Sequence, residues 1–290
     1  MTGASGAGIT LLTPDPDDDT RYDDWRDQAA EITALLPDIG IAYRAWSAPF
    51  EPAPLTLPVM AWGYHRHLDR WYAALEAWEA TGAHFANPVP VLRWNTDKRY
   101  LIDLDARGIP AVPTIDVPAL DTASMENARQ SLGAREFIIK PPVSAGSDDT
   151  FRLCANDAAP AAALGRRMLV QPLMSAILDQ GEWSLFYLGG RLAHCIVKRA
   201  KSGDFRVQPQ FGGQVTTEDP PRAATDLAET AIAAVATDLL YARIDLVADG
   251  AGFRIMELEL IEPWLYLHKA RDAGRAFADE IRKALLRQVV

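Results

Sequence analysis

The sequence is poor in cysteine, since it has only Cys154 and Cys195, which stand far apart and form no CxxC pair. Two distant cysteines predict reduced thiols in a cytoplasmic protein rather than a disulfide framework. No apolar stretch is long enough to span a bilayer. The first residues also lack a basic segment followed by an apolar run, so we expect neither a membrane anchor nor a signal peptide.

Basic residues are in deficit: 29 Lys and Arg stand against 39 Asp and Glu, which gives a formal net charge of −10. This balance argues against non-specific nucleic-acid binding. The hydrophobic fraction of 49% and the charged fraction of 23% are typical of a globular protein. At 290 residues the chain is long enough for one large or two ordinary domains.

Several catalytic motifs are absent. The sequence has no Gly-x-Ser-x-Gly elbow and no Gly-Lys-Ser/Thr loop before a helix. The glycines of segment 3–8 precede the first apolar run instead of following it, so they form no dinucleotide fingerprint. His65 and His67 lack a third ligand at metal spacing, which favours a packing role.

The order of apolar runs predicts an α/β fold with a small N-terminal three-layer domain and a largely parallel sheet. Its expected strands are 9–13, 41–46 and 59–62, and its expected helices are 25–36 and 67–81. Segment 14–24 holds six aspartates and two prolines, and we expect a mobile, solvated loop there. The motif at 87–90, Asn-Pro-Val-Pro, ends this unit.

The remaining chain predicts short helices followed by many strands. Expected helices are 96–107, 125–132, 158–164, 223–240 and 271–290. Expected strands include 137–141, 150–153, 168–171, 182–188, 191–198 and the runs around 243–247 and 253–260, with a connector and strand at 108–113. The pair Gly189-Gly190 is a strong hairpin signal.

Three acids stand in the last two expected strands: Asp245, Glu257 and Glu259. Alternate residues of a strand share a face, so Glu257 and Glu259 point the same way, about 7 Å apart at Cα. Clustered carboxylates repel unless a cation lies between them, and oxygen ligands select Mg²⁺ or Mn²⁺. The alternative is that these acids line a solvated sheet edge.

Basic residues precede this cluster. Lys140 ends an apolar strand and is followed by a small-residue loop, here called the phosphate loop (141–150), whose backbone N–H groups could cover a polyphosphate. An ordinary hairpin is the alternative for the loop. Lys98 considered alone is typical of a surface lysine. Glu182 could bind ribose hydroxyls, with an edge-strand acid as the alternative. Segment 198–213 is basic, and its Lys198 and Arg206 could stabilise a transferring phosphoryl group. Its glycine pair, Gly212-Gly213, could let this segment close over the site, whereas a solvated charge run is the alternative.

Taken in order, these pieces resemble the ATP-grasp superfamily. The chain is similar to the glutathione synthetase branch, and most similar to the subgroup that includes the ureido-serine cyclo-ligase of cycloserine biosynthesis. The closer match is carried by segments 87–88, 94–98, 203–208, 241–245 and 256–263. Two departures are visible: many relatives have Asn where Glu259 stands, and the phosphate loop is poor in glycine.

The resemblance implies an N-terminal α/β domain at 1–88, a central lid domain at 89–175 and a C-terminal ATP- and Mg-binding domain at 176–290. ATP would lie between two antiparallel sheets. The residues implied to contact ATP are Lys98, Lys140, Ser144, Gly146, Ser147, Gln171, Pro172, Leu173 and Glu182. Lys198 and Arg206 would address the γ-phosphate and an acyl phosphate, and Asp245, Glu257 and Glu259 would hold two Mg²⁺ ions, with Mn²⁺ as an alternative.

The implied reaction is ATP-dependent ligation through an acyl phosphate, forming a C–N bond within or between small amino-acid derivatives. Substrate selection would fall to Trp62, Tyr64, His65 and Glu262, although Trp62 and Tyr64 are residue types more often found in a core. The alternatives are a kinase that transfers the γ-phosphoryl group, a peptide or amino-acid ligase of glutathione synthetase type, and a nucleotide-binding module without turnover. The resemblance leaves open a homo-oligomer, either a dimer or a tetramer.

Overall fold

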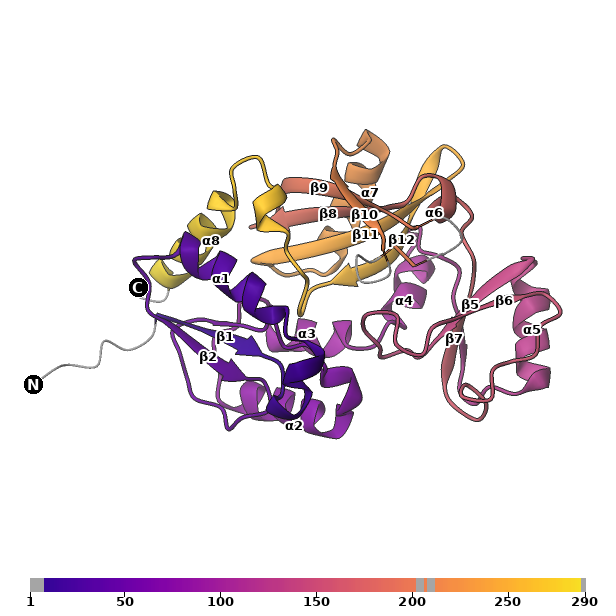
Figure 1. The fold of residues 1–290 in the computed structure, drawn as a ribbon, viewed down its shortest axis with the longest axis horizontal. Coiled ribbons are helices and arrows are strands. Elements are labelled where there is room, and N and C mark those ends of the chain that lie inside the picture. Colours follow the sequence, from indigo (N-terminus) through magenta and orange to yellow (C-terminus); the bar gives the residue numbers. More distant parts are fainter. Residues whose placement is uncertain (1–7, 202–205, 208–211, 288–290) are drawn as a thin grey trace, which may run out of the picture.

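The computed structural model describes residues 8–201, 206–207 and 212–287, which form three sheets with covering helices (Figure 1). The N-terminal sheet has the order β2-β1-β3 and is parallel, as expected. Its strands are β1 (Ile9–Thr13), β2 (Ile41–Ala45) and β3 (Thr56–Leu57). Helices α1 (Trp25–Leu35) and α8 (Arg275–Leu286) cover one face, and α2 (Leu68–Ala80) and α3 (Val89–Asn95) cover the other.

The third strand of this sheet differs from the expected 59–62. It lies at Thr56–Leu57, and Pro58, which has no backbone N–H, follows it directly. The next residues turn back on themselves, with Ala61 N–H donating to the Pro58 carbonyl, and Val59, Met60 and Ala61 are fully buried. The apolar run therefore reflects a buried turn instead of a strand.

The expectation of a solvated loop at 14–24 is wrong for Asp15 and Asp18. The segment contains the 3₁₀ helix η1 (Pro16–Arg21), and Asp15 and Asp18 are buried. Asp15 lies 2.6 Å from Arg70, and Asp18 lies 2.8 Å from His67. Residues 64–70, comprising η2 (Tyr64–Arg66) and the start of α2, bring these partners to the acidic segment. Paired charges can be buried where isolated ones cannot, which explains the order.

The four-stranded sheet is antiparallel with the order β4-β7-β5-β6. Its strands are β4 (Ile115–Val117), β5 (Glu136–Lys140), β6 (Phe151–Cys154) and β7 (Met168–Pro172), and α5 (Thr122–Leu132) packs on it. The helix expected at 158–164 is absent, since these residues form turns. Only four residues separate Pro160 from Gly165, too few to offset the cost of helix nucleation.

The five-stranded sheet is antiparallel with the order β10-β9-β8-β11-β12. Its strands are β8 (Glu182–Leu188), β9 (Arg191–Arg199), β10 (Gln214–Thr217), β11 (Tyr241–Asp249) and β12 (Gly252–Glu259). Gly189 and Gly190, at φ 53° and 74°, form the expected hairpin turn. The other elements are α4 (Tyr100–Ala106), α6 (Ala176–Asp179), α7 (Arg222–Ala234) and η4 (Leu267–Lys269).

The two faces of this sheet have different partners. One face packs against α4 and α7. On the other face, Phe186 and Leu188 of β8 pack at one end with α8, while Val247 of β11 packs at the opposite end with Val112 and Ile177. The polar residues between these two apolar ends are left facing the four-stranded sheet, and this placement creates the site.

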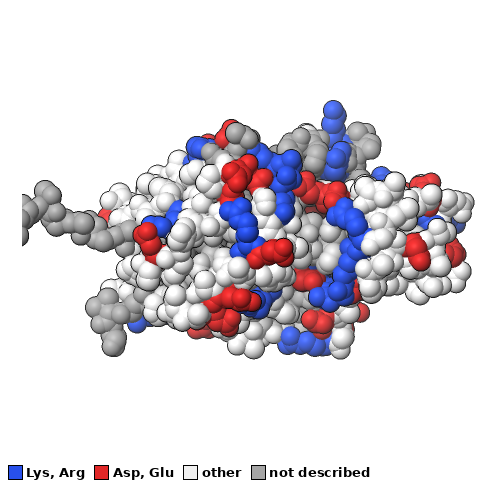
Figure 2. All heavy atoms as spheres, turned by 90° about the horizontal axis from the view of Figure 1, so that it is seen from below, with Lys and Arg blue, Asp and Glu red and all other residues white. Residues whose placement is uncertain are grey.

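Within the described part of the chain, no helix has both the length and the apolar character needed to cross a membrane. On the face drawn in Figure 2, acidic side chains lie among the basic ones, and a narrow band of basic side chains crosses the face right of its centre.

Candidate active site

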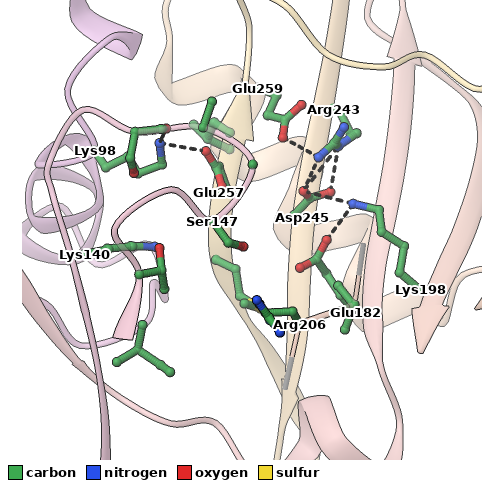
Figure 3. A pocket seen from close by; sticks show the side chains of 18 of the residues that line it. Lys98, Lys140, Ser147, Glu182, Lys198, Arg206, Arg243, Asp245, Glu257 and Glu259 are labelled. Carbon is green, nitrogen blue, oxygen red and sulfur yellow. Dashed lines mark hydrogen bonds and ion pairs between the residues drawn. The ribbon is translucent and has the colours of Figure 1, made fainter. Parts of the chain in front are cut away.

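A pocket lies between the four-stranded and five-stranded sheets, and Tyr22, Trp62 and Tyr64 of the N-terminal unit line one end of it. Lys98 and Lys140 approach from one side, while the carboxylates of β8, β11 and β12 stand on the other (Figure 3). The pocket thus has facing walls of opposite charge, an arrangement that can hold a polyphosphate together with cations.

The carboxylate wall is held by a network of buried charges. Lys198 Nζ lies 2.6 Å from Glu182 Oε1 and 3.5 Å from Asp245 Oδ2. Arg243 Nη2 donates to Asp245 Oδ2 at 2.8 Å and also to Glu259 Oε1. Burial alone would lower the pKa of Lys198, but the carboxylates of Asp245 and Glu182 outweigh it and raise that pKa to about 12. Lys198 therefore stays charged and neutralises the acids beside it.

The lysine wall is tied to the phosphate loop. Lys98 Nζ lies 3.1 Å from Glu257 Oε1 and donates to the Ser144 carbonyl, while Lys98 N–H donates to the Pro142 carbonyl at 2.8 Å. The phosphate loop has positive φ at Gly146, Ser147 and Asp149. Positive φ values of this kind occur in the turns that form backbone anion sites, while Asp148 N–H and Thr150 N–H of this loop donate to the carbonyls of Ala145 and Ser147.

Lys140 is the second basic group of this wall. It ends β5, is partly buried and lines the pocket. Burial lowers the pKa of Lys140 to about 8, against the pull of Glu257, which would raise it. A lysine whose charge is poorly compensated in the protein is prepared to receive an anionic ligand.

Metal binding by Asp245, Glu257 and Glu259 depends on how these carboxylates are arranged. Asp245 and Glu257 are direct partners across β11 and β12, and Arg243 stands opposite Glu259. Each acid is bonded to a basic side chain, and the described residues contain no group of three or more His, Cys, Asp or Glu side chains arranged around one point. The oxygen-only donor set fits Mg²⁺ chemistry, but the side chains pair with Lys98 and Arg243 instead of converging.

The opposite end of the pocket is apolar, with Val112, Ile177, Val207 and Met256 among its lining residues. Segment 171–173, which the resemblance implies to contact ATP, also lines the pocket. Gln171 Nε2 donates to Thr114 Oγ1 at 2.8 Å, and Leu173 N–H donates to the Glu136 carbonyl at 2.9 Å. A flat apolar slot beside strand backbone suits a heteroaromatic base.

All but one of the residues expected from the sequence to form the site line this pocket. They are Lys98, Lys140, Ser144, Gly146, Ser147, Gln171, Pro172, Leu173, Glu182, Lys198, Arg206, Asp245, Glu257, Glu259, Trp62, Tyr64 and Glu262. His65 is the exception, since its ring is buried and bonds Asp148 of the phosphate loop. Half of segment 198–213, namely 202–205 and 208–211, lies outside the described residues.

Sequence reasoning missed Arg243, which shares the strand face of Asp245 and bridges it to Glu259. The signal was available, because residues two apart on a strand point the same way. It also missed Tyr22, Trp264 and Tyr266 of the lining, for which no local pattern exists.

Three buried polar residues hold β11 and β12 in place. Asn87 Nδ2 donates to the carbonyls of Tyr241 and Leu260 at 2.9 and 2.7 Å. Asn95 Nδ2 donates to the Leu258 carbonyl at 2.8 Å, and Tyr100 OH accepts from Leu258 N–H. The motifs at 87–88 and 94–98 thus brace the strands that carry the acids.

Solved structures share this architecture along nearly the whole chain. A crystal structure of the D-cycloserine synthetase DcsG superposes with a TM-score of 0.78 at 25% identity, covering 96% of this chain and 99% of that one. The D-alanine–D-alanine ligase from Bacillus anthracis gives a TM-score of 0.73 at 14% identity, covering 96% and 97%. The fold and the site define the class of protein, an enzyme with the architecture of these ligases.

Sequence comparison identifies the family. The cycloserine biosynthesis protein DcsG of Streptomyces lavendulae is 33% identical over an alignment of 218 residues, and the match covers 68% of this chain and 72% of that protein. No family model matches the sequence. The chain belongs to the ATP-grasp family and is an ATP-dependent ligase.

Proposed function

We propose that this ligase closes a ring on a small amino-acid derivative such as ureido-serine, forming a C–N bond within one molecule. The observation that carries the proposal is the likeness to DcsG over nearly the whole chain, together with a pocket whose lysine and carboxylate walls are complete. Because each of the segments 1–88, 89–175 and 176–290 contains one of the three sheets, we also propose these segments as the domains.

In the proposed reaction, the substrate carboxylate attacks the γ-phosphorus of ATP, which gives an acyl phosphate and ADP. A nitrogen of the same substrate then attacks the acyl carbon, closes the ring and expels phosphate. Lys98 and Lys140 hold the phosphates, and Lys198, Arg206 and Arg243 face the charge that develops during transfer. Glu182 at the pocket wall accepts hydrogen bonds from the ribose hydroxyl groups.

Magnesium is part of the proposal. Asp245, Glu257 and Glu259 would hold two Mg²⁺ ions, or Mn²⁺, once Lys98 and Arg243 turn toward phosphate oxygens. A structure of the ATP-grasp ligase PsnB was solved with Mg and ADP; it gives a TM-score of 0.66 at 15% identity, covering 96% of this chain and 99% of that one. When bound, the ions would neutralise phosphate charge during transfer.

We also propose an oligomeric state and a location for the protein. The chain forms a homo-oligomer, a dimer or tetramer, which light scattering would measure. It acts in the cytoplasm, in keeping with the free thiols Cys154 and Cys195.

The test is release of ADP and phosphate with Mg-ATP and a panel of ureido-serine isomers, amino acids and small peptides. The variant Glu257→Gln serves as the control. ADP and phosphate released together with a cyclic product from one ureido-serine isomer would support the proposal. If ADP and phosphate were released only when two separate amino acids were present, the enzyme would be an intermolecular ligase and not a cyclo-ligase. Release of ADP without phosphate would indicate a kinase.

A further inference from the structure

The end of the pocket away from the apolar slot is aromatic. Trp62 and Trp264 stack with centroids 5.5 Å apart at an interplanar angle of 14°. Tyr22 lies 6.4 Å from Trp62, and Tyr266 lies 6.0 Å from Trp264. These four residues, here called the aromatic end, all line the pocket, although they come from two ends of the chain.

The aromatic end is fixed by buried hydrogen bonds. Gln28 is fully buried, and its Nε2 donates to the carbonyls of Val59 and Pro263 at 2.9 and 3.2 Å. Its Oε1 accepts from Leu265 N–H at 2.8 Å. A single side chain therefore joins the segment that carries Trp62 to the segment that carries Trp264, and preorganises both.

Two further features fix the indole of Trp62. Its Nε1 donates to the Glu262 carbonyl at 2.9 Å. The next residue, Gly63, has φ 88°, and a Cβ there would come within 2.9 Å of the Tyr22 ring. Only glycine lets the chain turn this closely against Tyr22.

Glu262 places a carboxyl group at the aromatic end. In the described part of the chain its hydrogen-bond partner is the Tyr64 hydroxyl, whereas Asp245, Glu257 and Glu259 are each bonded to a lysine or an arginine. Burial raises the pKa of Glu262 to about 7, although nearby Lys98 opposes the shift. A buried carboxyl group without a bonded cation is suited to bind a ligand cation.

The charges of the pocket thus have a direction. Glu262 and the aromatic rings line the same pocket as Lys98, and Lys98 is near enough to Glu262 for its charge to act on that carboxyl group. An amino acid whose carboxyl group points to Lys98 would carry its ammonium group toward Glu262. Carboxylate oxygens accept ammonium hydrogens, and aromatic rings within about 6 Å attract cations.

We propose that Glu262, bordered by Trp62 and Trp264, binds the α-ammonium group of the substrate and is a specificity-determining residue. This inference rests on the proposed function and narrows the substrate class to derivatives that keep an unreacted α-ammonium group. The ring nitrogen would come from elsewhere in the same molecule, so the ammonium group anchors the substrate without reacting.

The test compares O-ureido-serine with 3-(ureidooxy)propanoate, which lacks only the amino group. Binding is followed by the fluorescence of the pocket tryptophans in the full chain with a non-hydrolysable ATP analogue and Mg²⁺. The wild type should bind the better O-ureido-serine enantiomer at least about tenfold more tightly than the des-amino compound. Glu262→Gln should bind both within about twofold of each other, with unchanged affinity for the nucleotide.

Asp105→Asn is the matched control, since Asp105 is exposed on α4, does not line the pocket and loses the same charge. It should keep the tenfold preference. Retention of that preference by a folded Glu262→Gln variant would overturn the inference. So would equal or unmeasurable affinity of the wild type for the two compounds, a comparison that needs no variant.

Turnover measured in parallel separates this inference from the proposed function. If the protein preferred the amino compound but formed no ring, the proposed ring closure would be wrong and the ammonium site would be supported. If both compounds formed rings with equal efficiency, ring closure would be supported and the proposed ammonium site would be wrong.

Discussion

His65 Nε2 lies 3.2 Å from Asp148 Oδ2, and this contact joins the N-terminal unit to the phosphate loop. The imidazole is buried, and burial lowers the pKa of His65, which favours the neutral ring. Since the loop covers the pocket beside Lys98 and Lys140, the contact positions backbone N–H groups rather than performing chemistry.

We therefore expect His65→Ala to raise KM for ATP about three- to tenfold, with a smaller change in kcat. His65→Gln, whose amide can reach the place of Nε2, should recover most of the loss. Steady-state kinetics at varied ATP would measure both. An unchanged KM for ATP in a folded His65→Ala protein would rule out this positioning role.

Glu259 gives the carboxylate wall one more negative charge than an Asn at this position would. With Glu259→Asn, Arg243 keeps its bonds to Asp245, so we expect activity to persist. The Mg²⁺ concentration for half-maximal rate should rise about three- to tenfold, because one negative charge is lost. Titration of the rate with free Mg²⁺ tests this, with Glu257→Gln as the inactive reference. If the variant and the wild type had the same Mg²⁺ dependence, Glu259 would only pair with Arg243 and would not bind the metal.

Lys140 should reduce the stability of the ligand-free fold. Its pKa falls from 10.5 to about 8 on burial, so between these values the unfolded chain binds more protons and the free energy of unfolding rises with pH. Below pH 8 the full cost applies, about 3 kcal/mol at ~1.4 kcal/mol per tenfold change in acidity.

Lys140→Met should consequently melt several degrees higher than the wild type at pH 7, and this gain should shrink toward pH 10. The variant should also lose most of its affinity for ATP. Thermal melts over this pH range, with nucleotide titrations at pH 7, give both quantities. A lower melting temperature at pH 7 would contradict the assignment.

Asn87 is fully buried and bonds three backbone groups, since its Oδ1 also accepts from Leu240 N–H at 3.0 Å. Asn87→Ala would leave those groups without partners and should lower the free energy of unfolding by about 3 kcal/mol or more. Chemical denaturation measures this loss. Asn127→Ala, at an exposed position of α5, is the control and should change stability by less than about 0.5 kcal/mol.

Some of the site follows from local pattern. Period-two alternation places Glu257 and Glu259 on one face, and the structure has both in the pocket lining. The same rule extends to Arg243 and Asp245. Lys140 could be identified because it ends an apolar strand just before a small-residue loop. These inferences succeed because strand geometry fixes the direction of a side chain over a few residues.

Other parts depended on segments far apart in the sequence. The acidic segment 14–24 looks solvated by composition, yet Asp15 and Asp18 are buried because Arg70 and His67 are folded against them. The run 59–62 is apolar enough for a strand, but it forms a buried turn after Pro58.

The sequence by itself determined the α/β class, the order of most elements, the acid and lysine positions, and a resemblance to the family. Only the tertiary structure decided that Trp62 stacks on Trp264, that His65 bonds the phosphate loop, and that Glu262 turns to Tyr64. Local periodicity is set by backbone geometry, whereas pairing between distant side chains depends on how whole sheets and helices pack.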